Sequence, residues 1–368
     1  MIGIVTFFDE PNYGAALQAY ALQTVLTNDG YESEFVNLSL KSIIKDRLSL
    51  SLLDKIKILL LNKSIEKKLA RFRNFQITEL KISNKRCDNY SDFINNEVDK
   101  YETLIYGSDQ IWNPKLTGGE LSPFYFGADI NSSMKIAYAA SCGNNKVIID
   151  YREKYIEYLS GFKGVSVREK STARAINEEL GIKCMHVLDP TLLLQRQDWN
   201  QLIKKSSISK EYLDSKYIFV YSIQENELLN SAVETLSKKL DFKVITLRNA
   251  KHYNNEIARF PHADPYDFLA LINSAQIVVT NSYHAMLFSY MFEKQIALIP
   301  HSLYNERIED FVNLFSINPQ DMYYQKDSID IKKFTDNECC DKTKYETKKK
   351  KSFDYLIQNL GGKNEKRI

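Results

Sequence analysis

The chain has 368 residues, of which 44% are hydrophobic and 26% are charged, and its formal net charge is +2. This length and composition are typical of a soluble globular protein with about two domains, and so small a charge predicts no nucleic-acid partner. Five cysteines are scattered without a C-x-x-C or Cys/His pattern, and neither a secretory leader nor an apolar run of about 18 residues is visible; we therefore expect a cytoplasmic protein without a disulfide framework or structural zinc.

Strands and helices are predicted to alternate along the chain, which is typical of parallel sheets with crossover helices. Strands are expected at residues 2–8, 34–38, 103–106, 135–140, 164–167 and 185–188, then at 217–222, 243–247, 277–280 and 295–299. A polar stretch at residues 195–216 separates the two series of strands, and a linker is expected near residues 190–215. We predict an α/β protein with two Rossmann-like doubly wound domains, at residues 1–190 and 191–335. Residues 336–368 are expected to form a basic tail and a terminal helix that docks back.

Residues 41–86 form a basic insertion in the first domain. They contain 13 Lys and Arg against 4 Asp and Glu, an excess of 13 − 4 = 9, together with many leucines and isoleucines. One interpretation is a helical lid whose apolar side packs on the first domain and whose lysines are solvated. The other is a surface that contacts anionic lipid headgroups, with each Lys or Arg contributing about 1 kcal/mol.

Polar residues follow the first and third predicted strands. Asn12 is a natural helix cap, and Gly14 lets a ligand approach the backbone. Ser108, Asp109 and Gln110 lie directly after the third strand, close to Trp112 and Asn113. Carboxylate, amide and indole groups within six residues suit a sugar, because they offer hydrogen bonds to hydroxyls and a flat apolar face. The alternative is a polar turn with a tryptophan of the core.

Arg168 follows another predicted strand and precedes a probable helix start. An arginine in this place suits bidentate binding of a carboxylate or phosphate. The alternative is a structural ion pair with Glu169 or Asp189.

Residues 277–300 predict a buried strand, a polar elbow, a buried helix and a second strand. Asn281 or Ser282 is expected to cap the helix, whose positive end then faces the space beyond the strand. An anion would bind there, and His284 would exchange a proton with it near neutral pH. The alternative is a capping elbow with a structural histidine.

Six motifs in series resemble the polysaccharide pyruvyl transferase family, over about residues 2–315. They are N-Y-G at residues 12–14 with L-Q-A-Y at 17–20, G-S-D-Q-I-W-N at 107–113, A-Y-A-A-S at 137–141, S-V-R-E at 166–169, L-D-P-T at 188–191 and T-N-S-Y-H at 280–284. The resemblance implies a fold similar to the two-domain (GT-B type) glycosyltransferases. It also implies phosphoenolpyruvate as donor, and as acceptor a sugar of a cell-surface polysaccharide or of its polyprenyl diphosphate-linked precursor. The product would be a pyruvate ketal.

This chemistry assigns roles to the residues. His284 is the candidate acid, Arg168 and the helix start hold the donor's anions, and Asp109 takes a proton from the sugar hydroxyl. The predicted donor-binding residues are Arg168, Thr280, Asn281, Ser282, His284 and Arg307. The predicted acceptor-binding residues are Asn12, Tyr13, Gly14, Gln18, Ser108, Asp109, Gln110, Trp112, Asn113 and Ser141. No metal-ligand cluster or nicotinamide-binding motif is visible, so we expect no metal and no redox cofactor.

One position departs from the family pattern. Many members carry arginine two residues before the motif histidine, and here this residue is Ser282. Arg307 or Arg248 is a candidate replacement; otherwise the donor differs. The rival functions are a nucleotide-sugar-dependent glycosyltransferase and a non-catalytic glycan-binding protein. For a lipid-linked acceptor we expect the protein at the inner face of the membrane.

Overall fold

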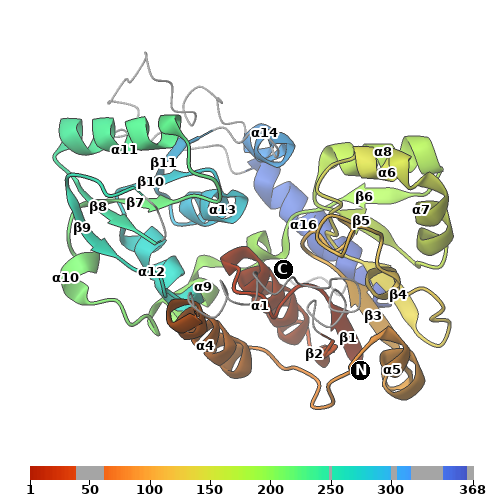
Figure 1. Cartoon of the computed structure of the whole chain (residues 1–368). Coiled ribbons are helices and arrows are strands. Elements are labelled where there is room, and N and C mark those ends of the chain that lie inside the picture. The colour runs from red at the N-terminus through yellow and green to blue at the C-terminus, as the bar shows by residue number, and fades with distance from the viewer. Residues whose placement is uncertain (39–61, 248–250, 300–304, 316–342, 363–368) are drawn as a thin grey trace, which may run out of the picture. The chain divides into compact units, whose positions relative to one another are not determined.

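A computed structural model describes residues 1–38, 62–247, 251–299, 305–315 and 343–362 (Figure 1). The chain divides into two compact units. Unit 1 comprises Met1–Leu61, Phe72–Leu194 and Glu346–Ile368, and unit 2 comprises Asn62–Arg71 and Gln195–Tyr345. The first unit's main segment thus ends at Leu194, close to the predicted domain boundary at residue 190.

Unit 1 contains a parallel sheet in the order β2-β1-β3-β4, formed by β1 (Ile2–Val5), β2 (Ser33–Phe35), β3 (Thr103–Tyr106) and β4 (Met134–Ala137). Strands β5 (Val165–Val167) and β6 (Cys184–His186) pair in parallel and join β4 through isolated bridges. The chain passes from β1 to β2 on one side, and β3 lies on the other side of β1. The carboxyl ends of β1 and β3 therefore form the switch point at which ligands bind in such sheets.

Side-chain caps fix the start of some helices of unit 1. Asn12 caps α1 (Tyr13–Asn28) as predicted, because its Oδ1 accepts hydrogen bonds from the N–H groups of Gly14 and Ala15. The remaining helices are α5 (Tyr90–Asn96), η1 (Val98–Lys100), η2 (Pro123–Phe126), α6 (Lys146–Asp150), α7 (Arg152–Leu159), α8 (Lys170–Leu180) and η3 (Pro190–Leu192).

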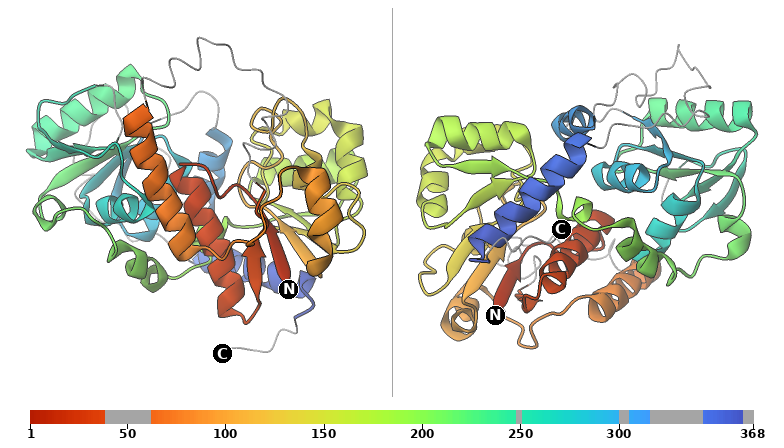
Figure 2. Two further views of the ribbon diagram at one scale, coloured as in Figure 1. Left: turned by 60° about the horizontal axis from the view of Figure 1, so that its bottom comes forward. Right: turned by 180° about the vertical axis from the view of Figure 1, so that it is seen from behind.

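The C-terminal helix α16 (Thr343–Asn359) docks on unit 1, as predicted (Figure 2). Lys348 Nζ donates to the carbonyl of His186 at 2.5 Å, and Ser352 Oγ accepts from the N–H of Leu188 at 2.9 Å. These bonds satisfy backbone groups at the end of β6, so the helix completes this edge of the sheet.

Unit 2 contains a second parallel sheet, in the order β11-β10-β7-β8-β9. Its strands are β7 (Tyr217–Tyr221), β8 (Lys243–Thr246), β9 (Glu256–Arg259), β10 (Ile277–Thr280) and β11 (Gln295–Leu298), and its larger helices are α11 (Glu227–Leu240), α12 (Pro265–Ser274), α13 (Tyr283–Met291) and α14 (Asn305–Leu314). Here the switch point lies between β7 and β10. Strand β9 was not predicted, because it is a partly exposed edge strand with charged residues at both ends.

The linker predicted near residues 190–215 is wrong. Much of this stretch is folded as α9 (Arg196–Ile203) and α10 (Lys210–Leu213). Trp199 and Leu202 anchor α9, since both are buried and the Trp199 ring meets Phe288 edge-on at 4.9 Å. Three apolar side chains among polar ones, of which only two are buried, were too weak a periodic signal to predict the helix.

Helix α4 (Asn62–Glu79) is the helical part of the basic insertion that the structure describes; residues 39–61 lie outside the described residues. Within unit 1, Phe72 and Phe75 are buried, and Gln76 Nε2 donates to the carbonyl of Phe8 at 2.9 Å. Lys67 and Arg73 are exposed. This is the apolar packing that the lid interpretation expects, while membrane contact stays a prediction. Among the described residues, no helix has the length and apolar character needed to cross a bilayer.

Candidate functional site

Polar side chains of unit 1 meet at the switch point of its sheet. Gln18, on α1, donates from Nε2 to Thr6 Oγ1 at 3.2 Å and to the carbonyl of Phe7 at 3.0 Å, while its Oε1 accepts from the N–H of Ser108 at 3.2 Å. Thr6 Oγ1 in turn donates to the carbonyl of Ser108 at 2.8 Å. Gln18 and Ser108, both predicted to bind the acceptor, are thus brought together. Both are fully buried, so they fix the loop after β3 instead of facing solvent.

The backbone of this loop has unusual conformations. Gly107 has φ +126°, and a Cβ atom there would lie 2.2 Å from the carbonyl oxygen of Tyr138. Asp109 has φ +68°, and Ala139 in the neighbouring loop has φ +53°. Such conformations cost about 1–3 kcal/mol for a residue with a side chain and cluster at functional sites. The loop therefore needs strong tertiary contacts to hold Asp109.

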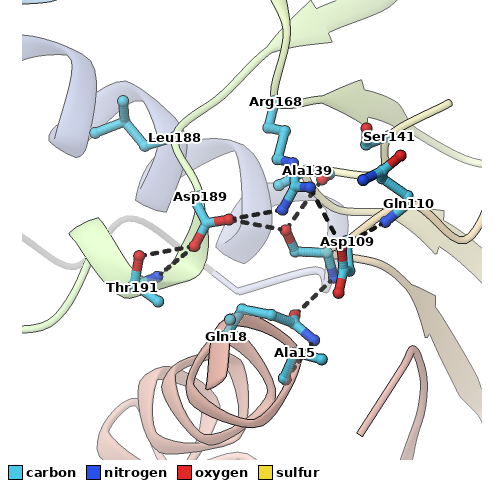
Figure 3. A network of polar contacts seen from close by, with 12 residues as sticks. Ala15, Gln18, Asp109, Gln110, Ala139, Ser141, Arg168, Leu188, Asp189 and Thr191 are labelled. Carbon is cyan, nitrogen blue, oxygen red and sulfur yellow. Dashed lines mark hydrogen bonds and ion pairs between the residues drawn. The ribbon is translucent and has the colours of Figure 1, made fainter. Parts of the chain in front are cut away.

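Arg168 is at the centre of those contacts. Its side chain is 1% exposed, and its Nη2, Nη1 and Nε lie 3.3, 3.1 and 3.4 Å from carboxylate oxygens of Asp109, Asp189 and Glu169 respectively. Figure 3 shows the guanidinium beside Asp189 and Asp109. One cation and three carboxylates give a formal charge of 1 − 3 = −2. Both ion pairs of the structural interpretation are thus present, together with a third.

Asp189 binds four donors although no part of its side chain is exposed. Its Oδ1 accepts from Thr191 N–H at 3.0 Å and Thr191 Oγ1 at 2.8 Å, and its Oδ2 from Ser108 Oγ at 3.3 Å and Arg168 Nη1 at 3.1 Å. Asp189 was not among the predicted site residues. The local sequence does show that Asp189 precedes Pro190-Thr191, and in the structure it caps η3 from this position.

Asp109 is the partner of Arg168 that reaches the surface, with a side chain 11% exposed. Its Oδ1 accepts from the N–H of Gln110 at 2.8 Å and from Arg168 Nη2. No group within the described parts of the chain hydrogen bonds to its Oδ2. One carboxylate oxygen therefore stays available for a hydroxyl group from outside.

A second set of contacts leads from Glu169 to Gln110 and Asn113, the amide side chains predicted to bind the acceptor. Glu169 accepts from Ser141 Oγ at 2.7 Å, and Ser141 Oγ accepts from the N–H of Gly143 at 3.1 Å. A Cβ atom at Gly143 would lie 2.5 Å from Gln110 Oε1 and 2.6 Å from Asn113 Nδ2. The backbone at Gly143 thus packs directly on this pair of amides, which are bonded to each other at 2.8 Å.

The prediction for Trp112 requires correction. Its side chain is completely buried, stacks on Phe126 with ring centroids 5.2 Å apart, and donates from Nε1 to the carbonyl of Tyr125 at 3.0 Å. The indole therefore belongs to the core of unit 1 and presents no face to a sugar. Aromatic residues far away in the sequence cover it, and the local pattern around Trp112 does not reveal them.

The predicted residues at the start of α1 differ in exposure. Asn12 is exposed, whereas Tyr13 is buried with its ring 5.1 Å from that of Phe72, and Gly14 is also buried. Of the predicted acceptor residues, Asn12, Gln110 and the edge of Asp109 are therefore the ones that solvent reaches; Tyr13, Gly14, Gln18, Ser108, Trp112, Asn113 and Ser141 are buried.

The switch point of unit 2 is formed by the elbow before α13. Asn281 donates from Nδ2 to the carbonyl of Gln224 at 2.6 Å and accepts from the N–H of Ile223 at 2.8 Å. Thr280 Oγ1 donates to the carbonyl of Tyr221 at 2.6 Å, and Ser282 Oγ caps the helix through the N–H of Ala285. Thr280, Asn281 and Ser282 are buried, so their side chains hold the elbow in place.

His284 is the second residue of α13 and is half-buried, with its ring 5.3 Å from that of Tyr283. In residues 221–225 and 280–284, the two segments at this switch point, it is the one side chain that can carry a positive charge. The serine at position 282 is therefore not compensated within these segments. Arg248 and the side chain of Arg307 lie outside the described residues.

Comparison with solved structures identifies the class of fold. UDP-GlcNAc 2-epimerase from Neisseria meningitidis, bound to UDP-GlcNAc, is 11% identical, with a TM-score of 0.51 over 98% of this chain and 98% of that chain. UDP-N-acetylglucosamine 2-epimerase from Rickettsia bellii is 12% identical, with a TM-score of 0.51 over 98% and 95%. At such identities the likeness establishes the fold alone. The protein has the α/β fold of two Rossmann-like domains of the GT-B type, as predicted.

The sequence itself identifies the family. The profile of the family described as polysaccharide pyruvyl transferase matches residues 12–302, which is most of the chain. No curated protein matches the chain. The protein belongs to the polysaccharide pyruvyl transferase family, which confirms the resemblance found in its motifs.

Proposed function

We propose that the protein transfers a pyruvyl group from phosphoenolpyruvate to two hydroxyls of one sugar, giving a pyruvate ketal and phosphate. The sugar belongs to a cell-surface polysaccharide or to its lipid-linked precursor. Family membership supports pyruvyl transfer to a polysaccharide. The observation that carries the mechanism is Asp109 Oδ2, the oxygen that the buried network of unit 1 leaves available.

The charge of the unit 1 network supports a neutral, hydroxyl-rich ligand there. A formal charge of −2 repels a donor with a carboxylate and a phosphate, whereas carboxylate and amide oxygens accept hydrogen bonds from hydroxyls. Asp109 takes the proton of the attacking hydroxyl in this proposal, and Gln110 and Asn12 contact the acceptor. Arg168 holds Asp109. Direct contact between Arg168 and a donor anion would require one of the three carboxylates to leave the guanidinium.

The start of α13 supports binding of the anionic donor in unit 2. The first N–H groups of a helix lack partners within it and lie at the positive end of its dipole, so they bind phosphate or carboxylate. His284 lies in this first turn. In this proposal His284 gives a proton to the donor's methylene carbon or to the departing phosphate.

The reaction balances as follows. The methylene carbon gains one proton and becomes a methyl group, which makes the neighbouring carbon electrophilic. The first hydroxyl forms a C–O bond to this carbon and gives its proton to Asp109, while the bond to the phosphate oxygen breaks. The second hydroxyl then closes the ketal. The two hydroxyls release two protons, of which one is used at the methyl group and one leaves with the phosphate.

The test is release of phosphate from phosphoenolpyruvate by the purified protein with galactose, glucose or mannose glycosides as acceptors. We expect release only when a suitable acceptor is present. Thermal-shift measurements with phosphoenolpyruvate, UDP and GDP should show stabilisation by phosphoenolpyruvate alone. Stabilisation by a nucleotide, with no phosphate released, would instead support a nucleotide-sugar transferase. A melting temperature that responds to sugar, without phosphate release under any condition, would support a glycan-binding protein.

A further inference from the structure

We infer that Asp189 is a positioning residue of the acceptor site, acting through Arg168 and Ser108 to hold Asp109 with its Oδ2 toward the acceptor. The inference deepens the proposed function and rests on it for the catalytic readout. A second readout, the rigidity of the loop at residues 107–113, does not depend on the reaction.

Asp189 holds two consecutive residues of the loop, Ser108 directly and Asp109 through Arg168. Its Oδ2 accepts directly from Ser108 Oγ at 3.3 Å, and the same oxygen accepts from Arg168 Nη1 at 3.1 Å. The other terminal nitrogen of Arg168 lies 3.3 Å from Asp109 Oδ1. Because a guanidinium is planar and rigid, fixing Nη1 on Asp189 also fixes the direction of Nη2 toward Asp109.

The position of Asp189 is itself fixed from the opposite side. Thr191 donates to Asp189 Oδ1 from both its N–H and its hydroxyl, so each carboxylate oxygen has two donors. Asp189→Asn replaces one of these oxygens by an NH₂ group, which is a donor and cannot accept the hydrogen bonds that the oxygen accepted. In a fully buried site such as this one, that group leaves its neighbours unsatisfied.

The strained backbone of the loop explains why the contacts of Asp189 with Ser108 and Arg168 are needed. Asp109 has φ +68°, two residues after Gly107 with φ +126°. A strained conformation persists only where its surroundings impose it. Without Asp189, Ser108 loses its contact with this carboxylate and Arg168 loses one of its three, so the loop can relax and Oδ2 can turn away.

The experiment compares Asp189→Asn with a matched control, Glu178→Gln. Glu178 also pairs with an arginine of unit 1, Arg174, at 2.9 Å, but these two side chains are 57% and 75% exposed. Hydrogen exchange is measured for residues 107–113 and, as an internal reference, for β7 and β10. We expect Asp189→Asn to speed exchange in the loop at least tenfold and to leave β7 and β10 unchanged, with no effect from Glu178→Gln.

Turnover is measured in a double-mutant cycle with Asp109→Asn. We expect Asp189→Asn alone to lower kcat at least tenfold and to raise the KM for the acceptor, but to have little further effect on kcat once Asp109 is replaced. A purely structural role would lower both backgrounds by the same factor. Equal factors, or loop exchange identical to that of the control, would overturn the inference.

Two outcomes remain to be separated. If Asp189→Asn fails to fold, Thr191→Val removes one donor to Asp189 while keeping its charge, and the same changes are expected with smaller size; unchanged loop exchange and kcat in that variant would contradict the inference. If the wild-type protein releases no phosphate, the proposed function fails. The exchange experiment then still decides whether Asp189 holds the loop.

Discussion

His186 predicts how the stability of unit 1 depends on pH. His186 is the last residue of β6 and lies beside the docked helix α16. Burial, and then the positive charges of Lys348 and Lys170, lower the pKa of His186 from its ordinary 6.5 to about 4. In the unfolded chain the same imidazole keeps its ordinary pKa. Between these two values the unfolded state therefore binds a proton that the folded state does not.

The size and sign of the effect follow from this difference. Stability is complete above pH 6.5, is lost as the pH falls toward 4, and changes little more below that. The difference of 6.5 − 4 = 2.5 in pKa, at about 1.36 kcal/mol for each pKa unit, amounts to about 3 kcal/mol. His186→Gln removes the titration, so the stability of this variant should depend less on pH by that amount.

The assay is urea unfolding at several pH values between about 7 and 4. The protein has two tryptophans, Trp112 in unit 1 and Trp199 in unit 2, so Trp199→Phe leaves fluorescence that reports on unit 1. The control is His252→Gln, because the His252 side chain is 80% exposed. Acidic residues titrate in the same range in all variants and cancel in the comparison. If His186→Gln and the wild type lost the same free energy of unfolding between pH 6.5 and 4, the reasoning would be refuted.

Three further predictions concern the site and the surface. Gly107→Ala forces a Cβ atom to within 2.2 Å of Tyr138 O at φ +126°, so it should lower the free energy of unfolding by more than about 2 kcal/mol in a denaturant assay. The control is Gly30→Ala, at φ +85° with open space around it, which should cost only about 1 kcal/mol. Equal costs would contradict the role of the close approach to Tyr138. His284→Ala should lower kcat by about 10²–10⁴-fold without changing the far-ultraviolet circular dichroism, whereas unchanged kcat would remove His284 as the acid. Charge reversal in the basic insertion should weaken sedimentation with anionic liposomes more than about tenfold, and unchanged binding would contradict membrane contact; the substitutions are Lys55→Glu, Lys57→Glu, Lys67→Glu and Lys68→Glu.

Much of the fold was predictable because its signals are local. The buried strands β3 and β10 are uninterrupted apolar runs, and both were predicted with the bounds that the structure has. Asn12 was predicted as a helix cap and Ser282 as one of two candidates, and both cap helices, since capping depends on residues within one helical turn. Where apolar residues are few, as in α9, the same reasoning failed.

The site was less predictable because its geometry depends on distant contacts. The sequence predicts that residues after successive strands lie close together, since parallel strands bring their carboxyl ends to one edge. It does not predict that Gln18, Ser108 and Ser141 are buried there. Ser108 and Asp189 are 81 positions apart in the sequence but are joined by a hydrogen bond. The hydrogen bond from Arg168 to Asp109 likewise joins residues that are far apart in the sequence. The sequence therefore predicts candidate residues but does not show which of their side chains are buried.

The central claim is that Asp109 and His284 serve transfer of a pyruvyl group from phosphoenolpyruvate to two hydroxyls of one sugar. The most direct test is nuclear magnetic resonance of the product formed in heavy water from phosphoenolpyruvate and an accepted sugar. We expect a new methyl group that carries one deuterium on a ketal carbon, formed in step with phosphate, and much slower formation of this group in Asp109→Asn and His284→Ala. A product that keeps an unprotonated methylene group, or phosphate release without any ketal, would contradict it.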